Sequence, residues 1–191
     1  MAHDEHTHED KNNSVFKIAM NLAITCFISG AIIATTFAIT EPAAAEQRVK
    51  AKNDAMRELV KDAESFNPID GKDGWYGAMK GGKVVAYVVP ASSKGYGGAI
   101  EMLAAVTPDG KAMDYKVLKH NETPGLGDKM VEPKFRKQFA NKTANDMEVV
   151  KVPTDKNIQA LTGATITSRA VTKGIKEAVE AVAAYSATQK K

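Results

Sequence analysis

Residues 161–171, "LTGATITSRAV", place three threonines and a serine around Gly163 and Ala164, directly ahead of a helical pattern. If Thr167 or Ser168 caps that helix, the TGAT segment lies just outside its N-terminus. Unpaired backbone N–H groups and the positive end of the helix dipole favour an anion there. The small residues leave room for a phosphate, and the hydroxyls supply hydrogen bonds or a point of covalent attachment. The residues by themselves therefore allow a phosphate site, or only a capped helix after a tight turn.

Two helices are expected in the C-terminal half of the chain. The longer one covers about residues 168–185, and its apolar residues recur at the spacing of one helix face. This stripe consists of Val171, Ile175, Ala178, Val179 and Val182. The shorter helix covers residues 129–140, with Phe135 and Phe139 one turn apart and facing inward. Both helices need an apolar surface to pack on, and the segments upstream supply it.

Upstream of the loop, the chain has the composition and turn signals of a β-sheet. Strands are expected at residues 75–80, 83–90, 99–107, 113–120 and near 147–151. Gly81 and Gly82 read as a hairpin turn, and Pro90 is expected to end its strand. Short turns join the strands, so the sheet is predicted to be antiparallel. With its flanking helices, this part of the chain is assigned to the α+β class.

Two glycine-rich loops lie at the ends of the expected strands. The first, "SSKGYGG" at residues 92–98, offers Tyr96 for stacking on a ligand. The second, "NETPGLGDKM" at residues 121–130, can bring backbone amides close to a flat ligand because its glycines carry no side chain. Each loop alone is more often a turn than a site. Together with the TGAT segment, however, they place three such loops around one small sheet, which favours a binding site.

The N-terminal part of the chain contains an uncharged run from residue 18 to residue 40. As a helix, this run is long enough to cross a hydrocarbon core of roughly 30 Å. A cleaved signal peptide is the alternative, because "PAAAEQ" at residues 42–47 offers a cleavage pattern near Ala45. We expect a retained anchor. The expected organisation is a tail at 1–17, a transmembrane helix at 18–40, a connecting helix at 41–66 and a ligand-binding domain at 67–191.

The composition narrows the range of functions. Charged residues make up 26% of the chain and the net charge is +3, which gives no footprint for nucleic acid. Cys26 is the single cysteine, so neither an internal disulfide nor a thiolate metal cluster is expected, and no metal site is predicted. The sequence shows no Ser/His/acid set and no nicotinamide fingerprint. No catalytic residue is therefore assigned to this chain.

The loops and the N-terminal helix together resemble a known family. An apolar helix, "SKGYGG", "HNETPGLG" and "LTGATITSRAV", in this order and spacing, resemble the FMN-binding G subunit of the Rnf electron-transport complex. They resemble, less closely, the C subunit of the sodium-translocating NADH:quinone reductase. The resemblance implies an antiparallel-sheet FMN-binding domain that carries electrons within an ion-translocating ferredoxin:NAD⁺ oxidoreductase. Where the family pattern usually has an aspartate before the TGAT segment, this chain has Gln159.

The resemblance also implies a site. In the family, FMN is joined to a threonine through a phosphoester, and that threonine corresponds to Thr165 here. The bond is made by a separate flavin transferase that uses FAD as donor. The residues expected around the FMN are Thr162, Gly163, Ala164, Thr167, Ser168, Glu122, Thr123, Gly125, Leu126 and Gly127. His120, Lys94 and Lys129 are further candidates for contact with the flavin or its phosphate.

Partners and location follow from the same resemblance. The expected partners are the other membrane, iron–sulfur and flavin subunits of the complex, the flavin transferase and the membrane itself. The expected location is the bacterial inner membrane, with a single span and the flavin domain on the extracytoplasmic side. Charge alone does not fix this orientation, because basic residues on long translocated domains carry little weight. A function of another class also stays open, namely a membrane-tethered scaffold whose TGAT loop is only a helix cap.

Overall fold

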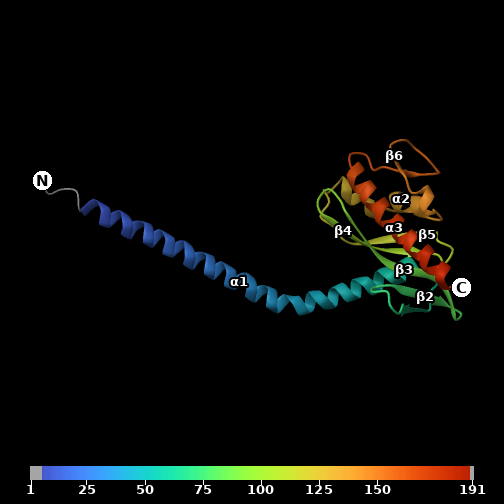
Figure 1. Ribbon diagram of the computed structural model, residues 1–191, viewed down its shortest axis with the longest axis horizontal. Helices are drawn as coiled ribbons and strands as arrows, with labels where there is room; N and C mark the ends of the chain where they lie inside the picture. Colours follow the sequence, from blue (N-terminus) through green and yellow to red (C-terminus); the bar gives the residue numbers. More distant parts are fainter. Residues whose placement is uncertain (1–5, 190–191) are drawn as a thin grey trace. The chain divides into compact units, whose positions relative to one another are not determined.

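The computed structural model describes residues 6–189, which divide into one compact unit up to Val49 and another from Lys50 onward (Figure 1). Helix α1 (His6–Leu59) runs from the first unit into the second. Residues 1–5 of the expected N-terminal tail lie outside the described part of the chain. The remainder of that tail is helical, so α1 begins well before the expected start at residue 18.

The first unit consists of α1 up to Val49. Among the described residues, α1 is the one helix that is long and apolar enough, by length and composition, to cross a membrane. The hydroxyls of Thr25, Thr35 and Thr40 each donate at 2.8 Å to the carbonyl four residues earlier. These polar side chains are thus satisfied by their own helix, which lowers the cost of placing them in apolar surroundings. The helix continues through Pro42.

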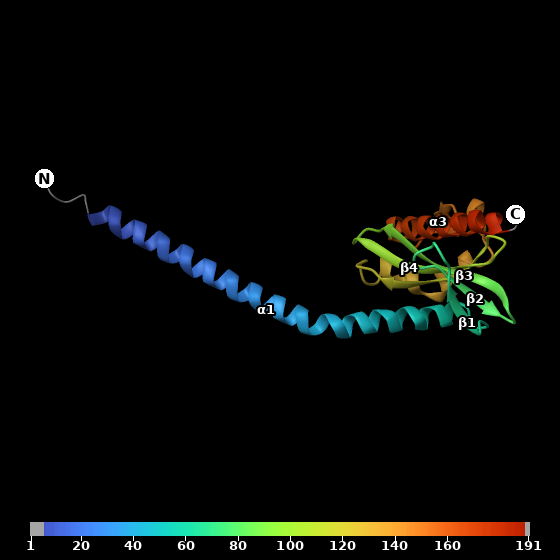
Figure 2. The ribbon, with the colours of Figure 1, turned by 60° about the horizontal axis from the view of Figure 1, so that its bottom comes forward.

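The second unit is built on a five-stranded antiparallel sheet whose strands follow one another in chain order, as expected for the α+β class (Figure 2). The strands are β1 (Ser65–Pro68), β2 (Tyr76–Lys80), β3 (Lys83–Lys94), β4 (Ala99–Val106) and β5 (Ala112–Lys119). Gly81 and Gly82 form the expected hairpin turn with φ of 55° and 74°, values that favour glycine.

Different helices cover the two faces of the sheet. Helix α3 (Thr165–Gln189) lies on one face, where the whole expected apolar stripe is buried against residues such as Tyr87 and Met102 (Figure 2). The last turns of α1 cover the opposite face, where Met56 packs against small side chains such as Ala86. Because successive residues of a strand point to opposite faces, β3 contributes to both clusters.

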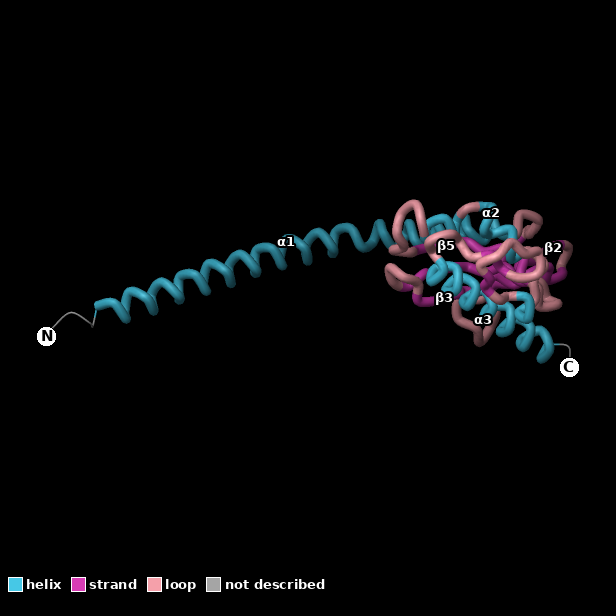
Figure 3. Tube along the Cα trace, turned by 90° about the horizontal axis from the view of Figure 1, so that it is seen from above, coloured by secondary structure: helices cyan, strands magenta, loops and turns pink. Residues whose placement is uncertain are grey.

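The edge strand β5 is covered by the segment of residues 127–146, which begins inside the second glycine-rich loop (Figure 3). This segment contains the short helices η1 (Gly127–Val131), α2 (Pro133–Arg136), η2 (Lys137–Phe139) and η3 (Ala144–Asp146). Phe135 and Phe139 are buried as expected, with ring centroids 5.6 Å apart. The single helix expected over residues 129–140 is wrong. Glu132 is extended and Pro133 starts a new turn, because a proline cannot sit inside a helix without removing a hydrogen bond.

Two expected boundaries and one additional strand differ from the structure. The helix expected to reach residue 66 ends at Leu59, because the chain from Ser65 pairs with β2. Pro90 does not end its strand. Strand β2 begins at Tyr76, opposite Val88, so beyond Val88 strand β3 has only β4 as a neighbour. The N–H that Pro90 lacks can therefore face the open side of the strand. Beyond β5, Val149–Val150 (β6) pairs in parallel with Ile158–Gln159 (β7), the second of which was not expected as a strand.

Candidate functional site

The three loops singled out in the sequence meet at one end of the sheet and line a cavity of about 620 Å³. The first glycine-rich loop contributes Tyr96. The second contributes Glu122, Thr123, Leu126 and Gly127. The TGAT loop contributes Gly163 and Ala164, and the first turn of α3 contributes Thr165, Ile166 and Thr167. The volume falls within the usual range of about 300–1,000 Å³ for small-molecule and cofactor sites.

Helix α3 begins at this cavity without a side-chain cap. The Ala164 carbonyl accepts the first helical hydrogen bond, from the Ser168 N–H at 3.0 Å, so Ala164 occupies the N-cap position. Alanine has no side-chain oxygen to accept from the first turn. The N–H groups of the next residues, Thr165 to Thr167, have no acceptor within the helix by its geometry. Donors and a positive dipole end are thus available where Thr165 lines the cavity.

The expectation that Thr167 or Ser168 caps α3 is wrong, because both lie inside its first turns. Ser168 is fully buried and instead closes the preceding loop. Its hydroxyl accepts from the Leu161 N–H and donates to the Ala164 carbonyl, both at 2.9 Å. The side chain therefore shapes the TGAT loop from behind and does not line the cavity.

Glu122 joins all three loops from a buried position. Glu122 is only 5% exposed, and one of its carboxylate oxygens accepts from the Gly97 N–H at 2.8 Å. The other oxygen accepts from the Thr167 hydroxyl. The Glu122 N–H in turn donates to Nδ1 of His120 at 3.2 Å, so that histidine supports the loop. One acidic residue thus holds the cavity walls together.

Glycine is required where these loops touch. A Cβ on Gly127 would lie 2.8 Å from the Thr167 hydroxyl oxygen and 2.9 Å from the Glu122 Cβ, closer than packed atoms allow. A Cβ on Gly95 would collide with the Glu122 carboxylate as well. Gly163 has a φ of 79°, and a Cβ there would lie 3.1 Å from the Leu126 Cδ2. These glycines therefore serve the contact between loops, in addition to leaving space for a ligand.

The cavity combines exposed apolar side chains with hydrogen-bond donors. Tyr96, Leu126 and Ile166 are 72%, 42% and 54% exposed although all three line it. Apolar side chains this open are suited to a flat aromatic ligand, whereas the uncapped helix end is suited to an anionic group. Ile166 was not singled out in the sequence, where it lies in the loop ahead of the expected helix. Tyr96 was noted there only as a stacking candidate.

Besides Ser168, two more of the expected cofactor contacts do not line this cavity. Gly125 is exposed in a turn, with a φ of 76°. Thr162 lines a second, smaller cavity of about 300 Å³, together with Lys129 and Gln159. The backbone N–H of Gln159 donates to the Gln138 side chain at 2.7 Å.

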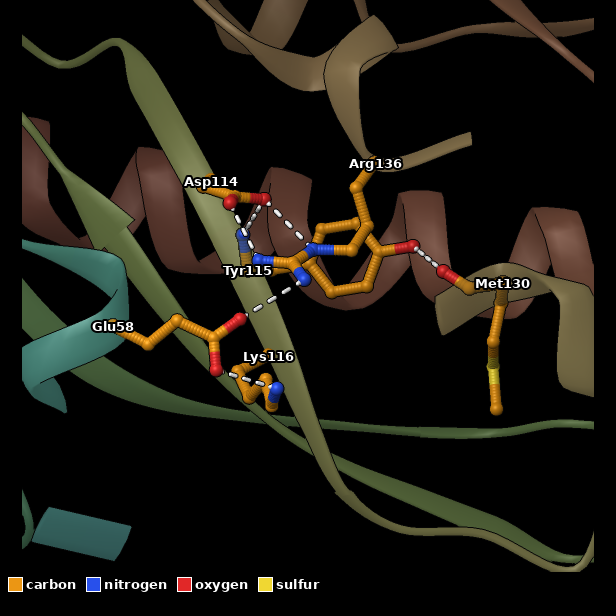
Figure 4. A network of polar contacts seen from close by, with 6 residues as sticks. All are labelled: Glu58, Asp114, Tyr115, Lys116, Met130 and Arg136. Atoms are coloured by element: carbon orange, nitrogen blue, oxygen red, sulfur yellow. Dashed lines mark hydrogen bonds and ion pairs between the residues drawn. The ribbon is translucent and has the colours of Figure 1, made fainter. Parts of the chain in front are cut away.

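Behind the cavity, a polar network fixes the segment that carries Gly127 (Figure 4). The Tyr115 hydroxyl donates to the Met130 carbonyl of η1 at 2.5 Å. Burial raises the pKa of Tyr115, which keeps this hydroxyl protonated and able to donate. Arg136 of α2 pairs with Asp114 of β5 at 2.6 Å and 3.1 Å, and with Glu58 at 3.3 Å.

The last turn of α1 belongs to the same network. Lys116 of β5 donates to Glu58 at 2.6 Å, and this hydrogen bond lowers the pKa of the Glu58 carboxyl. Figure 4 shows Glu58 between Lys116 and the guanidinium of Arg136. The edge strand β5 is thus tied to η1, to α2 and to the end of α1 by side chains from three successive positions.

Comparison with known domains and structures gives the class of protein, an FMN-binding domain. Residues 95–180, which include the second loop, the TGAT loop and the GYGG part of the first loop, match the FMN-binding domain family. The fold also resembles the crystal structure of Shewanella oneidensis NqrC, with a TM-score of 0.54 and 21% identity over 68% of this chain and 74% of that one.

Comparison over the full length then gives the particular family. The chain is 59% identical over 180 residues to the G subunit of the proton-translocating ferredoxin:NAD(+) oxidoreductase complex of Clostridium ljungdahlii, covering 93% of this chain and 97% of that one. It is 30% identical over 188 residues to the G subunit of the Na(+)-translocating ferredoxin:NAD(+) oxidoreductase complex of Acetobacterium woodii, covering 87% and 90%. The chain belongs to the family of G subunits of the ion-translocating Rnf complexes, which confirms the resemblance seen in its motifs.

Proposed function

We propose that this chain is a membrane-anchored electron carrier of an ion-translocating ferredoxin:NAD⁺ oxidoreductase, with FMN bound covalently through a phosphoester to Thr165. The observation that carries the proposal is the position of Thr165. Its half-buried side chain lines the cavity at the uncapped start of α3, where the glycine-rich loops converge. The relatives named as G subunits, matched over nearly their whole length, support the choice of complex.

The residues of the cavity fit FMN. Tyr96, Leu126 and Ile166 offer apolar surface to the flat ring system, and the N–H groups at the start of α3 offer donors to the phosphate. Glu122 and Thr167 hold the walls and leave the Thr165 hydroxyl available, because it makes no hydrogen bond with another described residue. FMN, when bound, supplies the electron-transfer chemistry, whereas the protein positions it and sets its surroundings.

Attachment requires only the Thr165 hydroxyl and a flavin transferase with FAD. The Thr165 oxygen forms the new bond to the flavin-side phosphorus and loses its proton, and the phosphoanhydride bond of FAD breaks to release AMP. The ester leaves the flavin ring unsubstituted and prevents loss of the cofactor. Reaction with ferredoxin and NAD⁺ belongs to the other subunits of the complex, since the sequence of this chain presents no catalytic set of its own.

The apolar run of α1 supports a single membrane anchor, by its length and composition. We place the flavin domain on the extracytoplasmic side of the bacterial inner membrane, as in the family that the motifs resemble. Reporter proteins fused to the C-terminus test this orientation. A reporter that is active only outside the cytoplasm is expected, and one active only in the cytoplasm would overturn the assignment.

Coexpression with a flavin transferase tests the covalent site. The wild-type chain should give a band that stays fluorescent after denaturing gel electrophoresis, and Thr165→Ala should abolish it. Thr162→Ala is the matched control, because Thr162 lies in the same loop but lines the other cavity. Its band should stay fluorescent. Fluorescence in the Thr165→Ala chain would refute the acceptor, and an unmodified wild-type chain would favour the tethered scaffold instead.

A further inference from the structure

Arg169 lies on α3 one helical turn after Thr165 and is exposed. Its guanidinium makes no ion pair or hydrogen bond with any residue between 15 and 189, the range over which side chains are described. The next basic residue of the helix, Lys173, differs in this respect because it pairs with Glu177 at 3.8 Å. Arg169 is therefore the basic side chain nearest along α3 to the cavity, and its charge is uncompensated by the described residues.

Helix geometry directs this side chain toward Thr165. Residues four apart lie on the same helix face, with Cβ atoms about 5–6 Å apart. Every Cα–Cβ bond of a helix tilts toward the N-terminus, so a long side chain covers the turn before its own Cα. For Arg169 that turn begins at Thr165. The flexible stem of arginine is long enough to bring the guanidinium beside a group attached to the Thr165 hydroxyl.

A positive charge near Thr165 would offset the repulsion between two negative groups at the cavity. A phosphodiester on Thr165 is an anion, and the buried Glu122 carboxylate lines the same cavity. Two negative groups in one cavity repel each other more strongly than they would in water. The N–H groups at the start of α3 offset part of this repulsion. The side chain of Lys129 lines the second cavity and not this one.

We propose that Arg169 is a phosphate-binding residue, whose guanidinium pairs with the flavin phosphate at Thr165. The planar guanidinium can hold two phosphate oxygens at once, which a point charge such as lysine cannot. The inference rests on the proposed FMN site and adds to it the residue that compensates the phosphate charge. It predicts that Arg169 distinguishes FMN from riboflavin, because the two ligands differ only in the phosphate.

Binding of the two flavins to the full-length Thr165→Val chain in detergent tests this prediction without the transferase. Quenching of flavin fluorescence gives the Kd for FMN and for riboflavin. Adding Arg169→Gln should raise the Kd for FMN by about 3- to 10-fold, as expected for loss of a partly exposed charge-assisted pair. The Kd for riboflavin should stay unchanged. Arg169→Lys should recover part of the loss. The matched control Lys173→Gln, one turn further along α3, should change neither Kd.

Two results would overturn the inference: an unchanged Kd for FMN in Arg169→Gln, or an equal loss for FMN and riboflavin. A second measurement uses the transferase and FAD. In the chain with Thr165 intact, Arg169→Gln should slow covalent flavin incorporation several-fold, whereas Lys173→Gln should match the wild type. Equal rates for wild type and Arg169→Gln would also contradict the inference. A wild-type chain that acquires no flavin would contradict the covalent site, and the comparison of FMN with riboflavin would still decide the role of Arg169.

Discussion

Replacing Tyr115 by phenylalanine removes one oxygen from the interior and leaves the ring in place. That oxygen donates to the Met130 carbonyl at 2.5 Å, and both residues are fully buried. The ring keeps its edge contact with Phe139, whose centroid is 5.1 Å away. The substitution therefore strands a buried carbonyl without creating a large cavity, which costs about 1–3 kcal/mol of unfolding free energy. For a unit of this size, that lowers the Tm by about 3–10 °C.

Thermal unfolding of the full-length chain in detergent measures this loss. Trp75, the single tryptophan, lies 5.7 Å from the Tyr185 ring and reports on the packing of α3 against the sheet. The control is Tyr96→Phe, which removes the same atom from a side chain 72% exposed and should leave the Tm unchanged. Equal Tm values for Tyr115→Phe and wild type would refute the view that this hydrogen bond fixes η1.

Two further predictions concern the cavity wall and the end of α1. Gly127→Ala should destabilise the chain by about 1–3 kcal/mol and reduce flavin incorporation, because the new Cβ meets Thr167 and Glu122; wild-type Tm and incorporation would contradict this. The pKa of Glu58 is lowered in the folded chain. Its contribution to the stability of the fold is therefore present above the pKa of the unfolded chain and is lost as the pH falls through the pKa of the folded chain. Between about pH 5 and pH 3, the Tm should therefore fall less steeply in Glu58→Gln than in wild type, and parallel curves would exclude a role for the pair with Lys116.

The sequence predicted the strands and the long C-terminal helix, because both follow from the spacing of neighbouring residues. The composition and turn residues predicted the four main strands and their antiparallel pairing, and the helical spacing predicted the buried stripe of α3. Pro90 misled because the effect of a proline depends on whether a second strand lies beside it, which is a tertiary fact. The segment from residue 127 to 139 misled for a related reason. Its apolar residues follow a helical spacing, but Pro133 and the contacts with β5 divide it into short turns.

The loops that form the site could be predicted from the sequence, but the hydrogen bonds that join them could not. The glycine-rich loops and the TGAT segment could be recognised, and the structure brings them to one cavity. The hydrogen bonds of Glu122 with Gly97 and Thr167 join residues far apart in the chain, so the spacing of residues in the sequence does not predict them. The role of Ser168 was also hidden, because a serine near a helix start suggests a cap, whereas this one bonds back to the preceding loop.

Peptide mapping tests the position of the flavin bond, on which the proposed function depends, more directly than any substitution does. The full-length chain, made together with a flavin transferase, is digested and its fluorescent peptide is analysed by tandem mass spectrometry. We expect one flavin-bearing peptide, with the phosphoester located on Thr165 and with Thr162 and Thr167 unmodified. A flavin phosphate on either of those threonines, or on a peptide outside the TGAT loop, would contradict the assignment of Thr165 as the acceptor.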